Sequence, residues 1–282
     1  MRIWAVLLFV GCDRAPPPLR ADAGPPIVIG GERRIRASGS SAGQPLLEAA
    51  KERFEARYKG KSIELSAGGS QKGISDVASG AVHIGSSDVS SVVPGLVDHR
   101  IAVVGFASMA NRGEFDSQIA SLSKETLAGI FSGAVRDWSD VGGSAQPIVV
   151  IYRAAGSGSR RVFAEYIMGG ASFVETQTEE NSGALVARLK RTPGAISYAA
   201  LSFRDPELLT LGIGEARPSE AAIAEGAWPL WSYEHLYTRG EATDVTKVFV
   251  EWMLGPEFQN DVLPTMRGYV PIARMRVARD GW

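Results

Sequence analysis

Residues 148–163 read IVVIYRAAGSGSRRVF, and this stretch decides the fold class. It opens with an apolar run that is typical of a buried strand. A glycine and serine turn follows at 156–159, and Val162, Phe163 and Tyr166 then stand at helical spacing. A strand that passes through a short turn into a helix is the repeating unit of α/β proteins.

The same alternation continues on both sides of this stretch. We expect strands at residues 34–37, 62–66, 82–85, 101–106, 147–153, 195–198 and 228–237, and helices at 45–58, 122–131, 182–191 and 243–254, with further helices opening at 70 and after 159. Strands that alternate with helices predict an α/β fold with mostly parallel sheets, and ligands at the carboxyl ends of the strands.

Composition narrows the function. Hydrophobic residues make up 45% of the 282 residues, and 30 basic against 31 acidic residues give a formal charge of −1. The chain therefore has no overall positive field for nucleic acid. No apolar run approaches the roughly 18 residues of a membrane-spanning helix, which excludes a polytopic membrane protein. With one cysteine, three scattered histidines and no Walker-type loop, we expect no internal disulfide, no metal and no organic cofactor.

The first twelve residues, MRIWAVLLFVGC, resemble a bacterial lipoprotein signal peptide. One arginine precedes eight apolar residues, a run too short to span a membrane. The resemblance implies that Cys12 becomes the lipidated N-terminus, and the proline-rich segment within residues 13–31 predicts a flexible tether. We therefore expect an extracytoplasmic lipoprotein, in the periplasm or at the cell surface, anchored to a membrane. The alternative is a buried N-terminal strand with a lone thiol.

Four serine and glycine clusters follow expected strands. They are Ser40-Ser41, Ser70, Ser86-Ser87-Asp88 and Ser157-Gly158-Ser159. A helix start carries unpaired N–H groups and about half a positive charge, so several starts aimed at one point can hold a small anion. Arg153 adds a planar fork suited to two oxygens of a tetrahedral oxyanion. Taken alone, each cluster has another interpretation, an ordinary N-cap.

Six segments then carry a family resemblance. They are GSSAGQP (39–45), GGSQKGI (68–74), IGSSDV (84–89), IFSGAVRDWSDVGG (130–143), IVVIYRAAGSGSRRVF (148–163) and PGAISY (193–198). In this order they resemble the phosphate-binding subunits of bacterial phosphate ABC importers, from about residue 34 to the C-terminus. The resemblance implies a two-lobed periplasmic-binding-protein (type II) fold, α/β, with two crossover strands. It implies phosphate ligands at Ser40, Ser41, Ser70, Asp88, Arg153, Ser157, Gly158 and Ser159.

The family's topology also implies a division of the chain. Crossings near 101–106 and 228–237 give a lobe I of residues 32–105 plus 229–282 and a lobe II of residues 106–228. The implied function is that of a monomeric receptor, not an enzyme. It captures inorganic phosphate between the lobes and delivers it to the membrane permease of an ABC importer.

Asp88 is expected to decide which anion is accepted. A carboxylate repels a dianion unless the anion can donate a proton, and near neutral pH phosphate carries one whereas sulfate does not. The chain departs from the family at Ala155, where an acidic partner for the arginine is frequent, and at Ser159, where threonine is commoner. Lys72 is expected near the cleft as added positive potential.

Three other functions stay open. Two are close to the phosphate-receptor function: binding of another oxyanion such as sulfate, molybdate or tungstate, and phosphate sensing without transport. The third is a serine hydrolase, because residues 39–43 satisfy G-x-S-x-G, and Asp88 and His235 follow Ser41 in triad order. We favour the receptor, since hydrolase nucleophiles come after several strands and the chain has no HGGG-type segment.

Overall fold

A computed structural model describes residue 31 and residues 33–112, 119–174 and 177–279. The strands are β1 (Arg34–Gly39), β2 (Ser62–Ala67), β3 (Ile84–Ser87), β4 (Leu96–Asn111), β5 (Ser121–Leu122), β6 (Val149–Val150), β7 (Tyr152–Arg153), β8 (Thr178–Glu179), β9 (Ala195–Ala200), β10 (Leu208–Thr210), β11 (Gly212–Ile213), β12 (Trp231–Arg239) and β13 (Tyr269–Val270). The α-helices are α1 (Gln44–Arg57), α2 (Ser70–Ser79), α3 (Lys124–Phe131), α4 (Gly158–Phe163), α5 (Ser182–Arg191), α6 (Glu220–Ala224) and α7 (Asp244–Leu254). Cys12 and the expected tether, apart from residue 31, lie outside the described residues.

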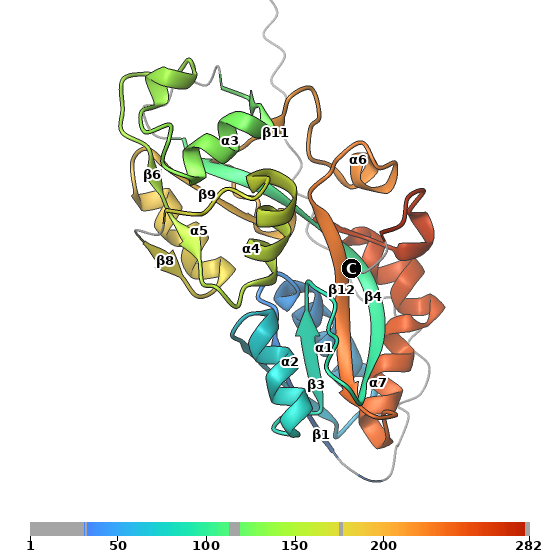
Figure 1. Ribbon diagram of the computed structural model, residues 1–282. Coiled ribbons are helices and arrows are strands. Elements are labelled where there is room, and N and C mark those ends of the chain that lie inside the picture. The colour runs from blue at the N-terminus through green and yellow to red at the C-terminus, as the bar shows by residue number, and fades with distance from the viewer. Residues whose placement is uncertain (1–30, 32, 113–118, 175–176, 280–282) are drawn as a thin grey trace, which may run out of the picture.

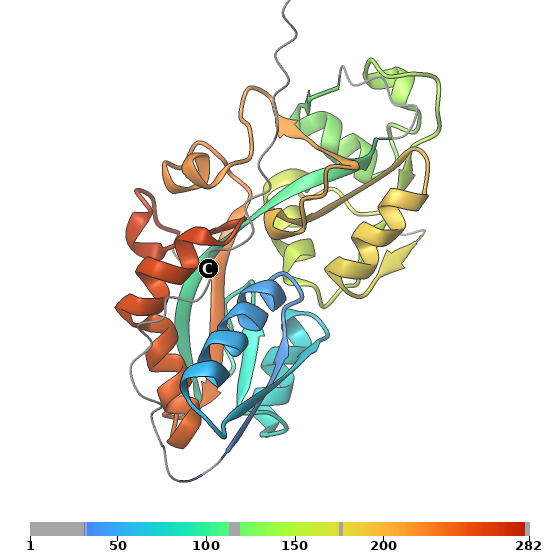
Figure 2. The same ribbon diagram turned by 180° about the vertical axis from the view of Figure 1, so that it is seen from behind.

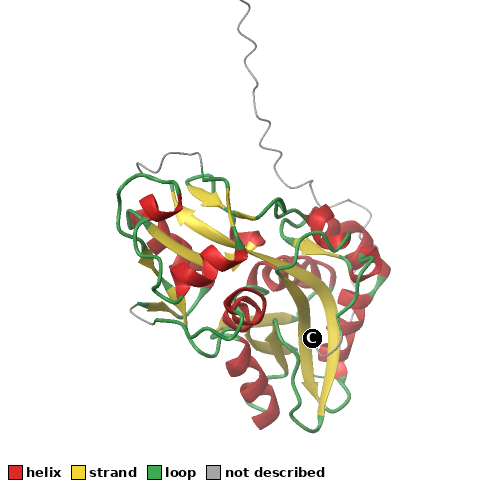
Figure 3. Ribbon diagram, turned by 45° about the horizontal axis from the view of Figure 1, so that its top comes forward, coloured by secondary structure: helices red, strands yellow, loops and turns green. Residues whose placement is uncertain are grey.

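The chain forms two α/β halves that share the long strands β4 and β12 (Figures 1 and 2). One half contains β1, β3, α1, α2 and α7, and the other contains β6, β9, α3, α4 and α5 (Figure 1). In a tilted view the two long strands curve from one half toward the other, with helices around them (Figure 3). This arrangement is the two-lobed α/β fold that the sequence predicts.

The sheet is mixed rather than mostly parallel, so that expectation was wrong. Its strand order is β2-β1-β3-β12-β4-β9-β6, with β10 and β13 also paired to β4. β1 runs parallel to β2 and β3, and β6 runs parallel to β9. β12 is antiparallel to β3 and β4, and β4 is antiparallel to β9. β4 and β12 are antiparallel because they carry the chain between the halves in opposite directions.

Strand β4 changes partners in its middle. Residues 96–105 pair with β12, whereas residues 106–110 pair with β9. The expected strand at 101–106 is therefore the centre of a 16-residue strand that serves both halves. The predicted lobe boundaries at 105/106 and 228/229 stay a prediction, and this change of partner supports the first of them.

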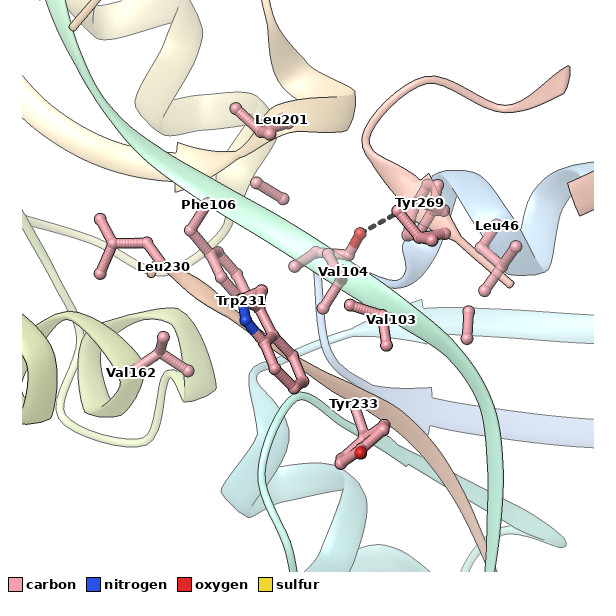
Figure 4. Packing of buried hydrophobic residues seen from close by; sticks show 14 of the residues in the cluster. Leu46, Val103, Val104, Phe106, Val162, Leu201, Leu230, Trp231, Tyr233 and Tyr269 are labelled. Atoms are coloured by element: carbon pink, nitrogen blue, oxygen red, sulfur yellow. Dashed lines mark hydrogen bonds between the residues drawn. The ribbon is translucent and has the colours of Figure 1, made fainter. Parts of the chain in front are cut away.

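Large buried side chains fill the junction where the halves meet. Figure 4 shows Phe106, Leu230 and Trp231 lying together beside β4 and β12, with Tyr269 on the far side of β4. Trp228 Nε1 donates a hydrogen bond to the Phe106 carbonyl oxygen at 2.8 Å, and its ring has no exposed surface. Truncating a buried tryptophan costs about 3–5 kcal/mol, so this packing fixes the path of both shared strands.

Helix positions are predicted better than strand extents. The expected helix at 182–191 coincides with α5, and Asn181 caps it by accepting a hydrogen bond from the Ala184 N–H at 2.8 Å. The expected strand at 147–153 is instead split into β6 and β7, because β6 pairs with β9 while β7 pairs with β8. None of the helices in the described part of the chain combines the length and apolar character needed to cross a membrane.

Candidate anion-binding site

The eight predicted ligands stand at strand ends and helix starts. Ser40 and Ser41 follow β1, Ser70 begins α2, Asp88 follows β3, Arg153 ends β7, and Ser157, Gly158 and Ser159 form the cap and first residues of α4. All eight are buried. Because β1, β2 and β3 are parallel, their carboxyl ends share one edge of the sheet. That edge faces the start of α4 and the end of β7, so the structure brings the eight residues into one cluster.

Arg153 is the cation of the cluster, and its side chain is only 1% exposed. Its two terminal nitrogens donate to the hydroxyls of Ser41 at 2.9 Å and Ser182 at 3.0 Å. The guanidinium also donates to the carbonyl oxygens of Glu179 at 3.3 Å and Glu180 at 3.2 Å. Burial lowers the pKa of Arg153, and the nearby Asp88 charge opposes that shift. Arg153 is thus a buried cation held by neutral acceptors.

Asp88 is the anion of the cluster and is 2% exposed. Its two carboxylate oxygens accept hydrogen bonds from the hydroxyls of Ser40 and, at 3.2 Å, Ser159. Its backbone N–H donates to Ser70 Oγ at 3.0 Å. Burial raises the pKa of Asp88, whereas the two serine hydroxyls and the Arg153 charge lower it. The other three predicted clusters therefore all bond to Asp88, Ser40 and Ser159 at its carboxyl and Ser70 at its backbone N–H.

Gly158 provides the close approach between α4 and the Asp88 carboxyl. A Cβ at this position would come within 2.7 Å of Asp88 Cβ and would also collide with Ser70 Oγ. Ser157, one residue earlier, accepts a hydrogen bond from the Arg160 N–H at 3.3 Å and so has the capping role that serine commonly has. The role of these residues as phosphate ligands stays a prediction.

Hydrogen bonds cross directly between the two halves at this site. Arg153 reaches Ser41, Ser159 reaches Asp88, and the Gln71 N–H donates to the Gly156 carbonyl oxygen at 3.1 Å. We name the Asp88 side as Ser40, Ser41, Ser70 and Asp88, and the Arg153 side as Arg153, Ser157, Gly158, Ser159 and Ser182.

Two residues of the cluster were missed from the sequence. Ser182 begins α5, is fully buried, and shares its hydroxyl with Arg153 and Ser41. It follows β8 in an Asn-Ser-Gly turn, the same signal that identified the other clusters. Glu234 has no exposed surface and lies close to Asp88. A charged residue inside the otherwise buried strand β12 is the signal that could have found it.

Two further sequence features, Lys72 and Ala155, can be described in their structural setting. Lys72 is half-exposed and pairs with Asp76 one helical turn later, so its charge is already matched. Ala155 leaves the guanidinium of Arg153 with hydroxyl and carbonyl partners; among the described residues no carboxylate is bonded to it.

The residues of the hydrolase alternative do not form a triad. Ser41 Oγ is bonded to Arg153 and Ser182, and it is Ser40 that donates to Asp88. His235 Nδ1 lies 2.8 Å from Asp98 Oδ1. The described residues contain no group of three or more His, Cys, Asp or Glu side chains that could hold a metal ion.

Comparison with known proteins shows the family to which the chain belongs. The chain belongs to the PBP superfamily, whose domain matches residues 27–257. It is 39% identical over 250 residues to the phosphate-binding protein PstS of Bacillus subtilis, an alignment that covers 86% of this chain and 82% of the relative. It is 28% identical over 214 residues to phosphate-binding protein PstS 3 of Mycobacterium tuberculosis, covering 64% of this chain and 57% of that one.

Solved structures share the fold. One is a putative phosphate ABC transporter substrate-binding protein with bound phosphate from Clostridium perfringens, at 24% identity and a TM-score of 0.78, covering 85% of this chain and 99% of that chain. Another is an ABC-type phosphate transport receptor from Vibrio cholerae, at 21% identity and a TM-score of 0.66, covering 84% and 99%. The chain thus has the two-lobed fold of these binding proteins.

Proposed function

We propose that this chain is an extracytoplasmic receptor that binds inorganic phosphate between its two lobes and delivers it to the permease of an ABC importer. One observation carries the proposal: a buried arginine and a buried aspartate lie in a single hydroxyl-lined cluster built from both halves. The 39% identity to a protein named phosphate-binding supports the choice of anion.

The Arg153 side has the chemistry to bind the anion's charge. A guanidinium offers paired N–H groups that match two oxygens of a tetrahedral oxyanion. The hydroxyls of Ser182 and, across from it on the Asp88 side, Ser41 now accept from Arg153, and both can rotate to donate to those oxygens instead. A receptor of micromolar affinity needs about −8 kcal/mol, and charge-assisted hydrogen bonds contribute roughly 1.5–3 kcal/mol each. A handful of such bonds is therefore enough.

The Asp88 side has the chemistry to require a proton on the anion. Ser40 and Ser159 each occupy one oxygen of Asp88, and an ionised carboxylate has about four acceptor positions, so a phosphate hydroxyl can still be accepted. Sulfate has no proton to give, so its charged oxygen would face the carboxylate unpaired.

Ligand-driven closure follows from the position of the site. The cluster takes residues from both halves, and β4 and β12 are shared by them. A ligand shifts a conformational equilibrium only when it contacts the favoured state more strongly, so phosphate must touch both sides to close the lobes.

The decisive experiment is calorimetric titration of ligand-stripped protein with phosphate and, in parallel, with sulfate and molybdate. We expect micromolar or tighter phosphate binding and sulfate binding weaker by about 10⁴-fold or more. Tight sulfate or molybdate binding with weak phosphate binding would assign the chain to another oxyanion.

Replacing the selecting carboxyl tests its role directly. Asp88→Asn removes the acceptor charge and adds an amide donor, so we expect the preference for phosphate over sulfate to narrow by at least about tenfold. Asp140→Asn, an exposed aspartate, is the matched control. Unchanged exclusion of sulfate in Asp88→Asn would remove Asp88 from this role.

Lipid anchoring through Cys12 and a monomeric state complete the proposal. Each of these two properties has its own test. Cys12→Ser should release the protein from membranes in a fractionation experiment, while sedimentation of the released protein should give the mass of one chain. Continued membrane association of the variant would contradict the anchor.

A further inference from the structure

Glu234 carries a buried carboxyl and is not one of the eight predicted phosphate ligands. It lies within β12, where the register with β4 slips between Glu234 and His235, and it has no exposed surface. Alternate residues of a strand share a face. Ser232, two residues earlier, donates its hydroxyl to the Asp88 carbonyl oxygen, so this face of β12 lies against Asp88. The rings of Tyr233, His235 and Tyr237 lie on the other face, where Tyr233 meets His235 edge to face and His235 stacks on Tyr237.

The carboxyl of Glu234 is enclosed without a donor. Among the described residues, no nitrogen or hydroxyl group donates to either of its oxygens. It rests on the backbone of Gly43 at the start of α1, where a Cβ would collide with it. The Gly43 N–H itself donates to Ser40 Oγ at 3.0 Å, and Ser40 in turn donates to Asp88. Glu234 therefore occupies the same corner as the Ser40–Asp88 hydrogen bond. In the antiparallel pairing of β12 with β3, His235 lies opposite Ser87, so Glu234 and Asp88 are the next residues along the two segments.

Ionisation of both carboxyls would leave this corner with two negative charges and one buried cation, Arg153. Burying an unpaired charge is costly, and two adjacent carboxyls avoid the cost by keeping one proton. An unpartnered, fully buried carboxyl beside a carboxylate that already accepts two hydroxyls is the geometry of such a pair. The proton on Glu234 then supplies the missing hydrogen bond, with Asp88 as its acceptor.

We propose that Glu234 keeps its proton and donates it to Asp88, so that the two carboxyls share one negative charge, and that loss of this proton sets the alkaline limit of phosphate binding. This inference rests on the proposed function and deepens it, because it assigns to the same site a residue that tunes its charge. Glu234 acts through Asp88 and is a positioning residue rather than a phosphate ligand.

The charged and titratable groups around Glu234 agree with this assignment. Asp88 faces it from the end of β3, Tyr269 from β13, and Arg153 acts on the pair through Asp88. Burial raises the pKa of Glu234 well above its ordinary value, and the Asp88 charge adds to the rise. Burial also raises the pKa of Tyr269, with both carboxyls adding to it, so Tyr269 stays neutral. The Tyr269 hydroxyl donates to the Ala42 carbonyl oxygen and is not available to Glu234.

The direction of the pH effect follows from the raised pKa. Below that pKa, Glu234 is neutral and the site presents one carboxylate to phosphate. Above it, a second negative charge appears beside Asp88, and the dianion is repelled. Phosphate affinity should therefore fall as the pH rises from neutral to alkaline.

Glu234→Gln separates this proton from the rest of the site. Glutamine keeps the length of the side chain and an N–H donor for Asp88, but it cannot ionise. We expect wild-type affinity to fall by about tenfold or more over the alkaline range and the variant to lose that fall. Glu225→Gln, at an exposed position, should follow the wild type. The titration of free phosphate affects all three proteins equally, and coincident profiles of wild type and Glu234→Gln would overturn the inference.

A measurement without phosphate keeps the two proposals apart. Infrared spectroscopy of wild-type protein that carries carbon-13-labelled glutamate should reveal a protonated glutamate at neutral pH, shifted by the label and therefore distinct from aspartate. The absence of that band would overturn the inference even if the variant does not fold. Its presence in a protein that binds no phosphate would leave the shared proton standing and reject the proposed function instead.

Discussion

The two sides of the site bury opposite charges and surround them with different partners. Arg153 places its guanidinium against two hydroxyls and two carbonyl oxygens, all of them neutral. Asp88 takes two serine hydroxyls and has a second carboxyl, Glu234, beside it. The first arrangement leaves the positive charge uncancelled, whereas the second is itself rich in acid and, in the proposed function, accepts only a ligand that brings a proton.

This contrast suggests that the two sides contribute differently to anion binding, the Arg153 side to affinity and the Asp88 side to selectivity. Neutral partners fix the direction of the Arg153 fork without cancelling its charge, so the fork supplies attraction for any tetrahedral anion. In the proposed function the acidic Asp88 side adds little attraction, and its role is to discriminate between anions that carry a proton and anions that do not. Variants on the two sides should therefore differ in kind as well as in size.

The largest effect should come from removing the cation. In Arg153→Ala the bound anion would be buried without a formal counter-charge, and breaking a buried pair in this way costs about 3–5 kcal/mol. We expect phosphate affinity to fall at least about a hundredfold by calorimetry, and sulfate to be affected as well. Lys124→Ala, an exposed cation, is the control. Near-native phosphate affinity in Arg153→Ala would reject the assignment of the site.

An intermediate effect should come from crowding Asp88 with a substitution on the facing Arg153 side. In Gly158→Ala the new methyl group would meet Asp88 Cβ at 2.7 Å and the Ser70 hydroxyl, and such overpacking costs about 1–3 kcal/mol. We expect thermal unfolding to shift downward and phosphate affinity to fall about tenfold or more, since α4 must withdraw from Asp88. In the control Gly183→Ala the Cβ has only an ordinary contact, with Asn181 Oδ1 at 3.6 Å. Equal behaviour of the two variants would contradict the close approach.

The smallest effect should come from removing one hydroxyl on the Arg153 side. Ser182→Ala deletes an acceptor of Arg153 and a partner of Ser41, and such a bond contributes about 1–2 kcal/mol, or roughly tenfold in affinity. Ser123→Ala is the matched control, because Ser123 caps α3 far from the site. The control should lower stability by about 1 kcal/mol and leave affinity unchanged. An unaltered phosphate affinity in Ser182→Ala would show that Ser182 does not contribute to binding and that only the residues predicted from the sequence act on the Arg153 side.

Local sequence patterns predicted the parts of the site that repeat one structural feature, a serine or glycine turn between a strand and a helix. A serine or glycine turn after a strand signals a helix start whatever the rest of the chain does, and Ser40, Ser70 and Ser157 all lie at such turns. Ser182 carries the same signal and was overlooked. Glu234 could not be assigned in this way, because its partner Asp88 is 146 residues earlier and only the pairing of β12 with β3 brings them together.

The amino-acid sequence by itself determined the α/β alternation, the helix starts and the set of polar groups available to an anion, because each depends on neighbours within a few residues. The tertiary structure alone decided that β4 serves both halves, that the sheet is mixed, that Arg153 has neutral partners and that two carboxyls meet. Those features depend on contacts between segments far apart in the chain, and packing of the whole protein, not local preference, selects them.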